Sequence, residues 1–250
     1  MAKQLVYQVA VGSVPTFYND CINSVDRYCQ RIGADHIVQC EPILRIVPKR
    51  SYRSVNAMRL GYLPIYEKEN AFSYLDRYDK VAVIDADIYV KGSAPNIFDH
   101  CDRQFAAVME REMPLTRSYL TKIRKYSDGQ YSLLKGVDWQ WDANGAAFYN
   151  MGLMVLDASL HRDPVEFIRR PEFERFVNGE GHWRWSTDQT FLNYWLKKDG
   201  ISVRNLDWRW NALYGAVEAD AIRQAYFVHF FLSAKMPRGG AEIPELIAKL

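Results

Sequence analysis

Two aspartates one residue apart, Asp85 and Asp87, are the residues of this sequence best suited to metal chemistry. They directly follow the apolar run Val81–Ile84, which is typical of a strand buried on both faces. Residues i and i+2 of an extended segment point the same way, so both carboxylates project together from the strand end. Such a pair suits Mn²⁺ or Mg²⁺ that also binds phosphate oxygens. The alternative is a strand-end turn whose aspartates face water or cap the next element.

Two classes of enzyme carry an Asp-x-Asp pair after a hydrophobic strand. In phosphatases of the haloacid dehalogenase type the first Asp is a nucleophile, and a Thr or Val follows two residues after the second Asp. Here that position is Tyr89, which weakens the phosphatase interpretation. The other class is the glycosyltransferases of the GT-A fold. The segment Tyr78–Val90 resembles their nucleotide-sugar metal site.

Further along the chain the sequence resembles the retaining glycosyltransferases of family 8, which include glycogenin and bacterial lipooligosaccharide galactosyltransferases. Their Asn-x-Gly segment, Asp-Gln pair and His-Phe-x-Gly-x-x-Lys-Pro motif each have a counterpart in the same order. The counterparts are Asn150 and Gly152, then Asp188 and Gln189, then His229, Phe230, Lys235 and Pro237. One departure is Leu232, which stands where the family has the glycine of its last motif.

The resemblance implies a role for each matching residue. Asp85, Asp87 and His229 would bind the metal, with Mn²⁺ favoured over Mg²⁺ by the imidazole ligand. The catalytic residues would be Asn150, Asp188 and Gln189, which contact the transferred sugar. The donor site would comprise Ala10, Val11, Gly12, Tyr18, Lys68, Asp85, Ala86, Asp87 and Lys235, with Lys235 and Lys68 on the diphosphate.

Each of these positions also has a structural interpretation. His229 lies among aromatic residues and could be a core histidine with a satisfied hydrogen bond. Ser186 and Gln189 fit a capping box at the start of a helix. Asn150 could satisfy backbone groups at a bend. Lys68 is a weak candidate on its own, because lysines are common on protein surfaces.

Tryptophan is confined to the second half of the chain, where all seven occur. Sugar rings present flat apolar faces that stack on aromatic side chains, so these residues could form an acceptor site. The candidates are Trp183, Trp185, Trp208 and Trp210, each beside polar or turn residues, and Asp142, which directly follows Trp141. Trp195 follows a helical period and is expected in the core, and ordinary packing is the alternative for the others.

These residues favour a metal-dependent glycosyltransferase, specifically a hexosyltransferase, that moves a sugar from a nucleotide-diphosphate sugar, expected to be a UDP-sugar, to a glycan or other hydroxyl acceptor. Retention of the anomeric configuration is implied by the family resemblance alone. If the enzyme inverts instead, Asp188 or Asp142 would be the candidate base. The alternatives are a metal-dependent phosphohydrolase and a non-catalytic carbohydrate-binding protein.

The expected elements alternate between strands and helices, which indicates an α/β fold. We predict a single GT-A (Rossmann-like) domain over residues 1–250, with a mostly parallel central sheet flanked by helices. Residues 1–103 would form the nucleotide and metal half, and 104–250 the acceptor half with the motif at 229–237. Expected strands are 5–11, 36–40, 81–84, 104–109, 148–156 and 225–231, and expected helices are 16–32, 65–75 and one that starts at 163–164. Residues 111–136 are basic, show no clear buried face and are expected to form a surface segment.

Composition limits the class of protein and the cellular compartment that we expect. A formal charge of +2 and 48% hydrophobic residues disfavour disorder and a nucleic-acid surface. The four cysteines form no CxxC pair and are expected to be buried reduced thiols. The sequence shows no transmembrane segment. We therefore expect a cytoplasmic protein that binds a sugar donor and a glycan or glycoconjugate acceptor, while peripheral membrane association and the oligomeric state stay open.

Overall fold

The computed structural model describes residues 2–12, 14–48, 55–162, 171–178, 188–233 and 236–250. Its centre is a six-stranded sheet with the strand order β2-β1-β3-β6-β5-β7. Five strands are parallel, and β6 runs antiparallel between β3 and β5. The strands are β1 (Gln4–Val9), β2 (Asp35–Gln39), β3 (Lys80–Ile84), β5 (Phe105–Met109), β6 (Tyr149–Asp157) and β7 (Val203–Leu206). The prediction of an α/β fold with a mostly parallel sheet is confirmed.

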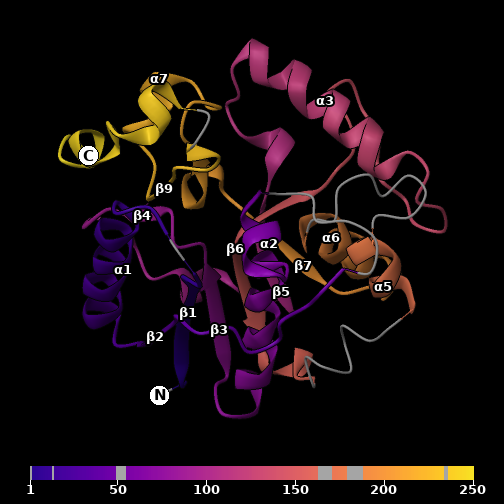
Figure 1. Cartoon of the computed structure of the whole chain (residues 1–250), viewed down its shortest axis with the longest axis horizontal. Coiled ribbons are helices and arrows are strands. Elements are labelled where there is room, and N and C mark those ends of the chain that lie inside the picture. Colours follow the sequence, from indigo (N-terminus) through magenta and orange to yellow (C-terminus); the bar gives the residue numbers. More distant parts are fainter. Residues whose placement is uncertain (1, 13, 49–54, 163–170, 179–187, 234–235) are drawn as a thin grey trace.

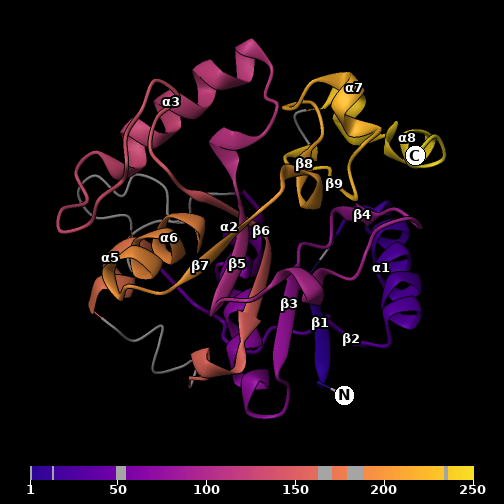
Figure 2. The same ribbon diagram turned by 180° about the vertical axis from the view of Figure 1, so that it is seen from behind.

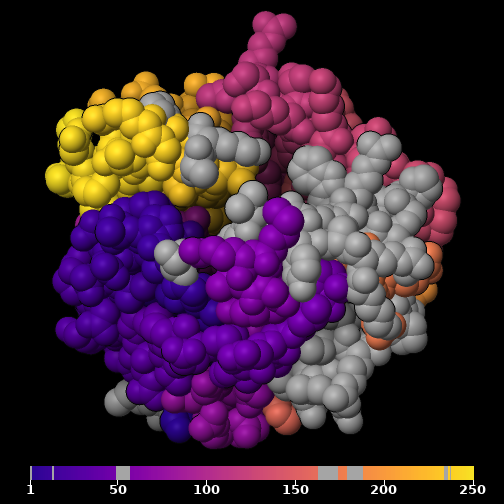
Figure 3. All heavy atoms as spheres, viewed as in Figure 1, coloured from indigo at the N-terminus to yellow at the C-terminus, as the bar shows by residue number. Residues whose placement is uncertain are grey.

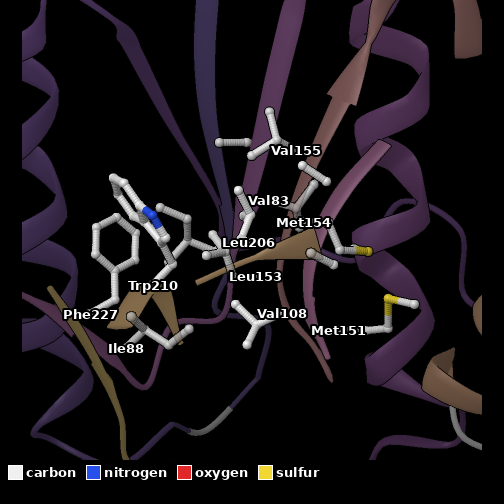
Figure 4. Packing of buried hydrophobic residues seen from close by; sticks show 14 of the residues in the cluster. Val83, Ile88, Val108, Met151, Leu153, Met154, Val155, Leu206, Trp210 and Phe227 are labelled. Atoms are coloured by element: carbon white, nitrogen blue, oxygen red, sulfur yellow. The ribbon is translucent and has the colours of Figure 1, made fainter. Parts of the chain in front are cut away.

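The middle strands are apolar because both faces of the sheet are covered. Val81–Ile84 of β3 is at most 2% exposed, and so are all apolar residues of β6 from Met151 to Leu156. Figure 4 shows Val83 of β3 beside Leu153, Met154 and Val155 of β6 in this core. Continuous apolar runs rather than alternating ones are what such strands require. This central pair fixes where β3 ends and therefore where Asp85 begins.

A second, smaller sheet lies beyond the end of β3. It consists of β4 (Ile88–Val90), β9 (Phe227–His229) and β8 (Ala212–Leu213), in the order β4-β9-β8. Strand β4 pairs antiparallel with β9, and Ile88 is opposite His229. The small sheet therefore joins the segment after the paired aspartates to a segment near the C-terminus. In Figure 3 the C-terminal part (yellow) lies directly against the N-terminal part (indigo).

Helices surround the two sheets. Figures 1 and 2 show α1 on one side of the molecule, next to β4, and α5 and α6 on the opposite side, near β7. The α-helices are α1 (Tyr18–Ile32), α2 (Val55–Leu60), α3 (Arg117–Tyr131), α5 (Pro171–Asn178), α6 (Asp188–Lys198), α7 (Ala219–Ile222) and α8 (Ile243–Ile247). The expected helix over 65–75 is a 3₁₀ helix, η1 (Pro64–Asp76), which carries Lys68. Short 3₁₀ helices also occur at η2 (Ile97–His100), η3 (Glu110–Glu112), η4 (Ala158–Leu160), η5 (Trp208–Trp210) and η7 (Pro237–Gly240).

One expectation about the basic segment 111–136 is wrong. Most of it is the helix α3, which begins after the N-cap Thr116 and has a buried face. That face contains Ile123 and Tyr131 but also Ser127 and Gln130, so its hydrophobic period is weak. Exposed cations such as Arg124 occupy the other face. The helix that we expected to start at residues 163–164 lies outside the described residues.

Within the described part of the chain, no helix is both long and apolar enough to cross a bilayer. All four cysteines are free thiols. Cys21, Cys29 and Cys101 are buried as expected, whereas Cys40 is exposed at the end of β2.

Candidate metal and donor site

Asp85, Asp87 and His229 come together although the histidine lies 142 positions after the second aspartate in the sequence. The Nε2 atom of His229 lies 3.2 Å from Oδ1 of Asp87 and 3.9 Å from Oδ2 of Asp85. One ligand atom from each residue lies within 4.8 Å of the other two. Two carboxylates and one imidazole that converge in this way form a donor set that suits Mn²⁺. The residues present therefore fit a divalent cation.

The elements explain this convergence. The backbone N–H of Asp85 donates to the carbonyl of Gly152 at 2.8 Å, which ties the end of β3 to β6. The N–H of Phe230, directly after β9, donates to the carbonyl of Asp87 at 3.0 Å. Backbone hydrogen bonds thus hold the strand of His229 next to the segment that carries both carboxylates. The three side chains that the family resemblance implies as metal ligands therefore lie close enough together to share one cation.

Burial and neighbouring charges act against each other in this cluster. Burial raises the pKa of Asp85 above its ordinary value, although the Lys68 ammonium opposes this. Burial also acts to raise the pKa of Asp87, but the His229 imidazole outweighs it and the pKa lies below its ordinary value. For His229, burial favours the neutral form, yet Asp87 beside it raises the pKa overall. Nearby positive charge thus favours the ionised form of both carboxylates against the effect of burial.

Lys68 supplies part of that charge from η1. Its Nζ atom donates to Oδ1 of Asp85 at 2.8 Å and to the carbonyl of Met151 at 3.1 Å, and it lies 2.9 Å from Oδ2 of Asp188. The ammonium group therefore has three protein oxygens as partners. The two carboxylates raise the pKa of Lys68 despite its burial, so the ammonium form is held. Lys68 thus links Asp85 of the candidate metal site to Asp188 at the start of α6.

A cavity of about 260 Å³ opens beside the cluster. Of the predicted donor residues, it is lined by Val11, Tyr18, Lys68, Asp85, Ala86 and Asp87. Its remaining walls come from Val9, Val14, Pro15, Pro64 and Ile65, which carry no spacing signal in the sequence. Ala10 and Gly12 flank Val11, and Gly12 has a left-handed φ of 83° beside Leu60. The cavity has an apolar side and a charged side, which is common in small-molecule sites.

The predicted catalytic residues lie on the β6 side of the cluster. The side chain of Gln189 accepts a hydrogen bond from the N–H of Met151 at 3.2 Å, and Asp188 is ion-paired to Lys68. Asn150 is 8% exposed. Its Nδ2 donates to Glu110 at 2.9 Å, and its Oδ1 accepts from Gly152 and Asn211. A contact between Asn150 and a sugar stays a prediction.

The candidate acceptor residues divide into three groups. Trp210 is 2% exposed and packs against Phe227, 5.4 Å between ring centroids, so it belongs to the core (Figure 4). Trp208 is half-buried, and Asp142 is exposed with Arg111 at 3.4 Å. Trp183 and Trp185 lie outside the described residues, as does Lys235. Trp195 is buried in the core as expected.

Two features of the site were not predicted. Asn211 and Glu110 are buried polar residues that continue the hydrogen bonds of His229 inward, and isolated residues of these types give no pattern in a sequence. Leu232 has a left-handed φ of 53°, the conformation that glycine favours. The backbone at this position therefore keeps a glycine-like geometry although the residue is a leucine.

No family model matches this sequence, and no curated protein matches it. The similarity is to solved structures. One is a glycosyltransferase involved in the glycosylation of the major capsid of PBCV-1, with a TM-score of 0.57 and 13% identity over 99% of this chain and 100% of that one. Another is the galactosyltransferase LgtC in complex with donor and acceptor sugar analogs, with a TM-score of 0.54 and 14% identity over 98% and 96% of the two chains. The chain therefore has the GT-A fold of these glycosyltransferases, as the motifs indicated.

Proposed function

We propose that this chain is a metal-dependent glycosyltransferase that moves a sugar from a nucleotide-diphosphate sugar to a hydroxyl acceptor. The observation that carries the proposal is the cluster of Asp85, Asp87 and His229 at the wall of a cavity, within a GT-A fold. Two carboxylates and an imidazole would bind the cation, and the cavity would receive the donor. A UDP-sugar and Mn²⁺ are the donor and cation we propose, from the family resemblance and the imidazole ligand.

The residues of this chain would share the work as follows. A bound divalent cation supplies Lewis-acid neutralisation of the charge that develops on the departing diphosphate. Lys235 adds a second positive contact there. Lys68, held between Asp85 and Asp188, fixes the orientation of both carboxylates. Asp188 and Gln189 bind the transferred sugar.

The transfer itself replaces one bond at the anomeric carbon. The bond from this carbon to the diphosphate oxygen breaks, and the acceptor oxygen bonds to the same face of the carbon. The acceptor proton passes to the departing diphosphate. Retention of configuration follows from this front-face course, and we propose it from the family resemblance. The anomeric configuration of the product, read by NMR, tests it: an inverted product would instead require a base such as Asp188 or Asp142.

The acceptor would bind next to the sugar, and exposed or half-buried aromatic residues are the candidates to contact it. Trp141 is 47% exposed beside Asp142, and Trp208 is half-buried. Stacking of a sugar ring on such side chains supports a glycan or glycoconjugate as acceptor. Trp183 and Trp185 remain part of this proposal, whereas the buried Trp210 is left out. A cytoplasmic location is proposed as well, supported by four free thiols.

A thermal-shift screen tests the donor class and the metal together. Nucleoside diphosphates, nucleotide sugars and free glycans are each added with and without Mn²⁺. We expect one nucleotide diphosphate to raise the melting temperature only when Mn²⁺ is present, because a ligand that binds the native state stabilises it. Glycan binding that survives chelation, with no nucleotide effect, would instead support a carbohydrate-binding protein. Release of phosphate from simple phosphomonoesters would support a phosphohydrolase.

A further inference from the structure

A line of hydrogen bonds runs from His229 into the protein, away from the cavity. Nδ1 of His229 lies 3.0 Å from Oδ1 of Asn211, and Nδ2 of Asn211 donates to Oδ1 of Asn150 at 2.9 Å. Nδ2 of Asn150 then donates to Oε2 of Glu110 at 2.9 Å. All four side chains are at most 8% exposed. Because these side chains are buried, bulk water does not compete for their hydrogen bonds.

The backbone fixes the direction of these bonds. The N–H of Gly152 can only donate, and it points at Oδ1 of Asn150 at 3.0 Å. The amide NH₂ of Asn150 must therefore face Glu110, whose other oxygen accepts from the Tyr119 hydroxyl at 2.9 Å. With Oδ1 of Asn150 fixed as an acceptor, the amide NH₂ of Asn211 must face it. This leaves the carbonyl oxygen of Asn211 facing His229.

A carbonyl oxygen beside Nδ1 requires that this nitrogen carry the hydrogen. In the neutral imidazole the lone pair is then on Nε2, the atom that faces Asp87 and Asp85. We propose that Asn211, Asn150 and Glu110 are positioning residues that hold His229 in this form and thereby set the affinity of the site for a divalent cation. The inference rests on the metal part of the proposed function and is independent of which sugar is transferred.

Gly152 provides the room for the same arrangement. A Cβ atom at this position would lie 2.4 Å from Cε1 and 2.7 Å from Nδ1 of His229, far inside contact distance. The imidazole can lie against β6 only because residue 152 has no side chain. Asn150 and Gly152 thus act together: one orients the partner of the imidazole, and the other lets the ring approach the strand.

The test compares cation affinity in two asparagine variants. Mn²⁺ alone is titrated into the full chain, and the free ion is measured by electron paramagnetic resonance. We expect Asn211→Ala to weaken Mn²⁺ binding about ten- to a hundredfold, the usual effect of losing a partner behind a metal ligand. The control is Asn193→Ala. Asn193 is equally buried and bonds to the backbone of Tyr149 and Gln189 but not to this line, so its loss should leave Mn²⁺ affinity unchanged.

Glu110 provides a second pair of variants in case Asn211→Ala fails to fold. Glu110→Gln keeps an acceptor oxygen for Asn150, and we expect its Mn²⁺ affinity to stay within about threefold of wild type. Glu110→Leu removes the acceptor and should weaken binding by about tenfold. Equal affinity in these two variants, or an unchanged affinity in folded Asn211→Ala, would overturn the inference alone. A wild-type chain that binds no Mn²⁺ would contradict the proposed function and the inference with it.

Discussion

Gly152 belongs to the Asn-x-Gly motif and also contacts His229 in the structure. The family resemblance identified the Asn-x-Gly pattern, and the structure explains the glycine: any side chain at this position would collide with the His229 ring. We expect Gly152→Ala to weaken Mn²⁺ binding at least about tenfold and to cost about 1–3 kcal/mol of stability, because the ring or the strand must shift. Titration with Mn²⁺ and urea unfolding measure the two effects.

Gly92 supplies the matched control for this change. It follows β4, has open space where a Cβ would be placed and has no left-handed φ. Gly92→Ala should therefore leave both Mn²⁺ affinity and stability close to those of wild type. A loss of Mn²⁺ affinity in both variants would mean that the contact with His229 is not the cause.

Glu69 gives the molecule a pH dependence that can be tested at a single residue. It is fully buried next to Lys68, and its carboxyl oxygens have no hydrogen-bond partner in the part of the chain that the structure describes. Burial raises the pKa of Glu69 to about 8, with Asp188 adding to the effect while Lys68 and Arg162 oppose it. The native state thus keeps a proton that the unfolded chain releases above pH 4.5, so stability falls as the pH rises from there towards 8.

Glu69→Gln removes this titration. Relative to wild type, the free energy of unfolding of the variant should rise by about 4 kcal/mol between pH 5 and pH 8, at about 1.4 kcal/mol per pKa unit. Urea unfolding at the two pH values measures the difference. Glu245→Gln, at an exposed glutamate, should show no such rise. A stability difference between Glu69→Gln and wild type that does not change with pH would contradict this account.

At the scale of elements, α3 shows where periodicity fails as a guide. Its buried positions are partly polar: the hydroxyl of Ser127 donates to the carbonyl of Ile123 at 2.8 Å, and Gln130 accepts from Thr190 at 3.1 Å. One bond lies within the helix and the other reaches Thr190 of α6, and together they satisfy polar groups inside a packed face, so a hydrophobic pattern is not needed there. The strands β1, β2, β3, β5 and β6 were predictable to within about two residues at each end, and β3 and β5 most directly because their runs are continuously apolar.

The N-cap of α3 can be tested by itself. The Thr116 hydroxyl oxygen accepts from the N–H of Tyr119 at 3.3 Å, and the residue has the extended conformation of a cap. Thr116→Ala should lower the free energy of unfolding by about 1 kcal/mol. Thr121→Ala, at an exposed position inside the same helix, should be neutral or slightly stabilising. Equal effects of the two changes in urea unfolding would show that the cap contributes nothing.

Only one strand of the small sheet was expected from the sequence: β9 lies within the strand predicted over 225–231, whereas β4 and β8 were not predicted. Its strands β4, β8 and β9 contain only two or three residues each, too few for an alternating pattern. Yet the pairing of Ile88 with His229 is what brings the histidine to the aspartates. The family resemblance singled out His229 as a candidate ligand, while the strand pairing that positions it became visible only in the structure.

At the scale of the whole molecule, the candidate metal site draws on both halves of the chain, as the predicted motif at 229–237 implies. The Cys-bearing first half provides Asp85, Asp87 and the cavity wall, but His229 comes from the second half. Trp139, Trp195 and Trp210 are core residues, so the tryptophans of the second half do not all serve an acceptor. The candidate metal site combines residues of both halves; the small sheet positions His229, and Lys68 pairs with Asp85 and Asp188.

The most direct test of the central claim is the release of UDP from a UDP-sugar in the presence of an acceptor mixture, with and without Mn²⁺. We expect wild type to release UDP only with Mn²⁺ and Asp87→Ala to be slower by about a hundredfold or more, since the cation's charge stabilisation is worth several kcal/mol. Asp102→Ala, at an exposed aspartate, should match wild type. Turnover that is undiminished in Asp87→Ala, or equally fast without a divalent cation, would contradict the account.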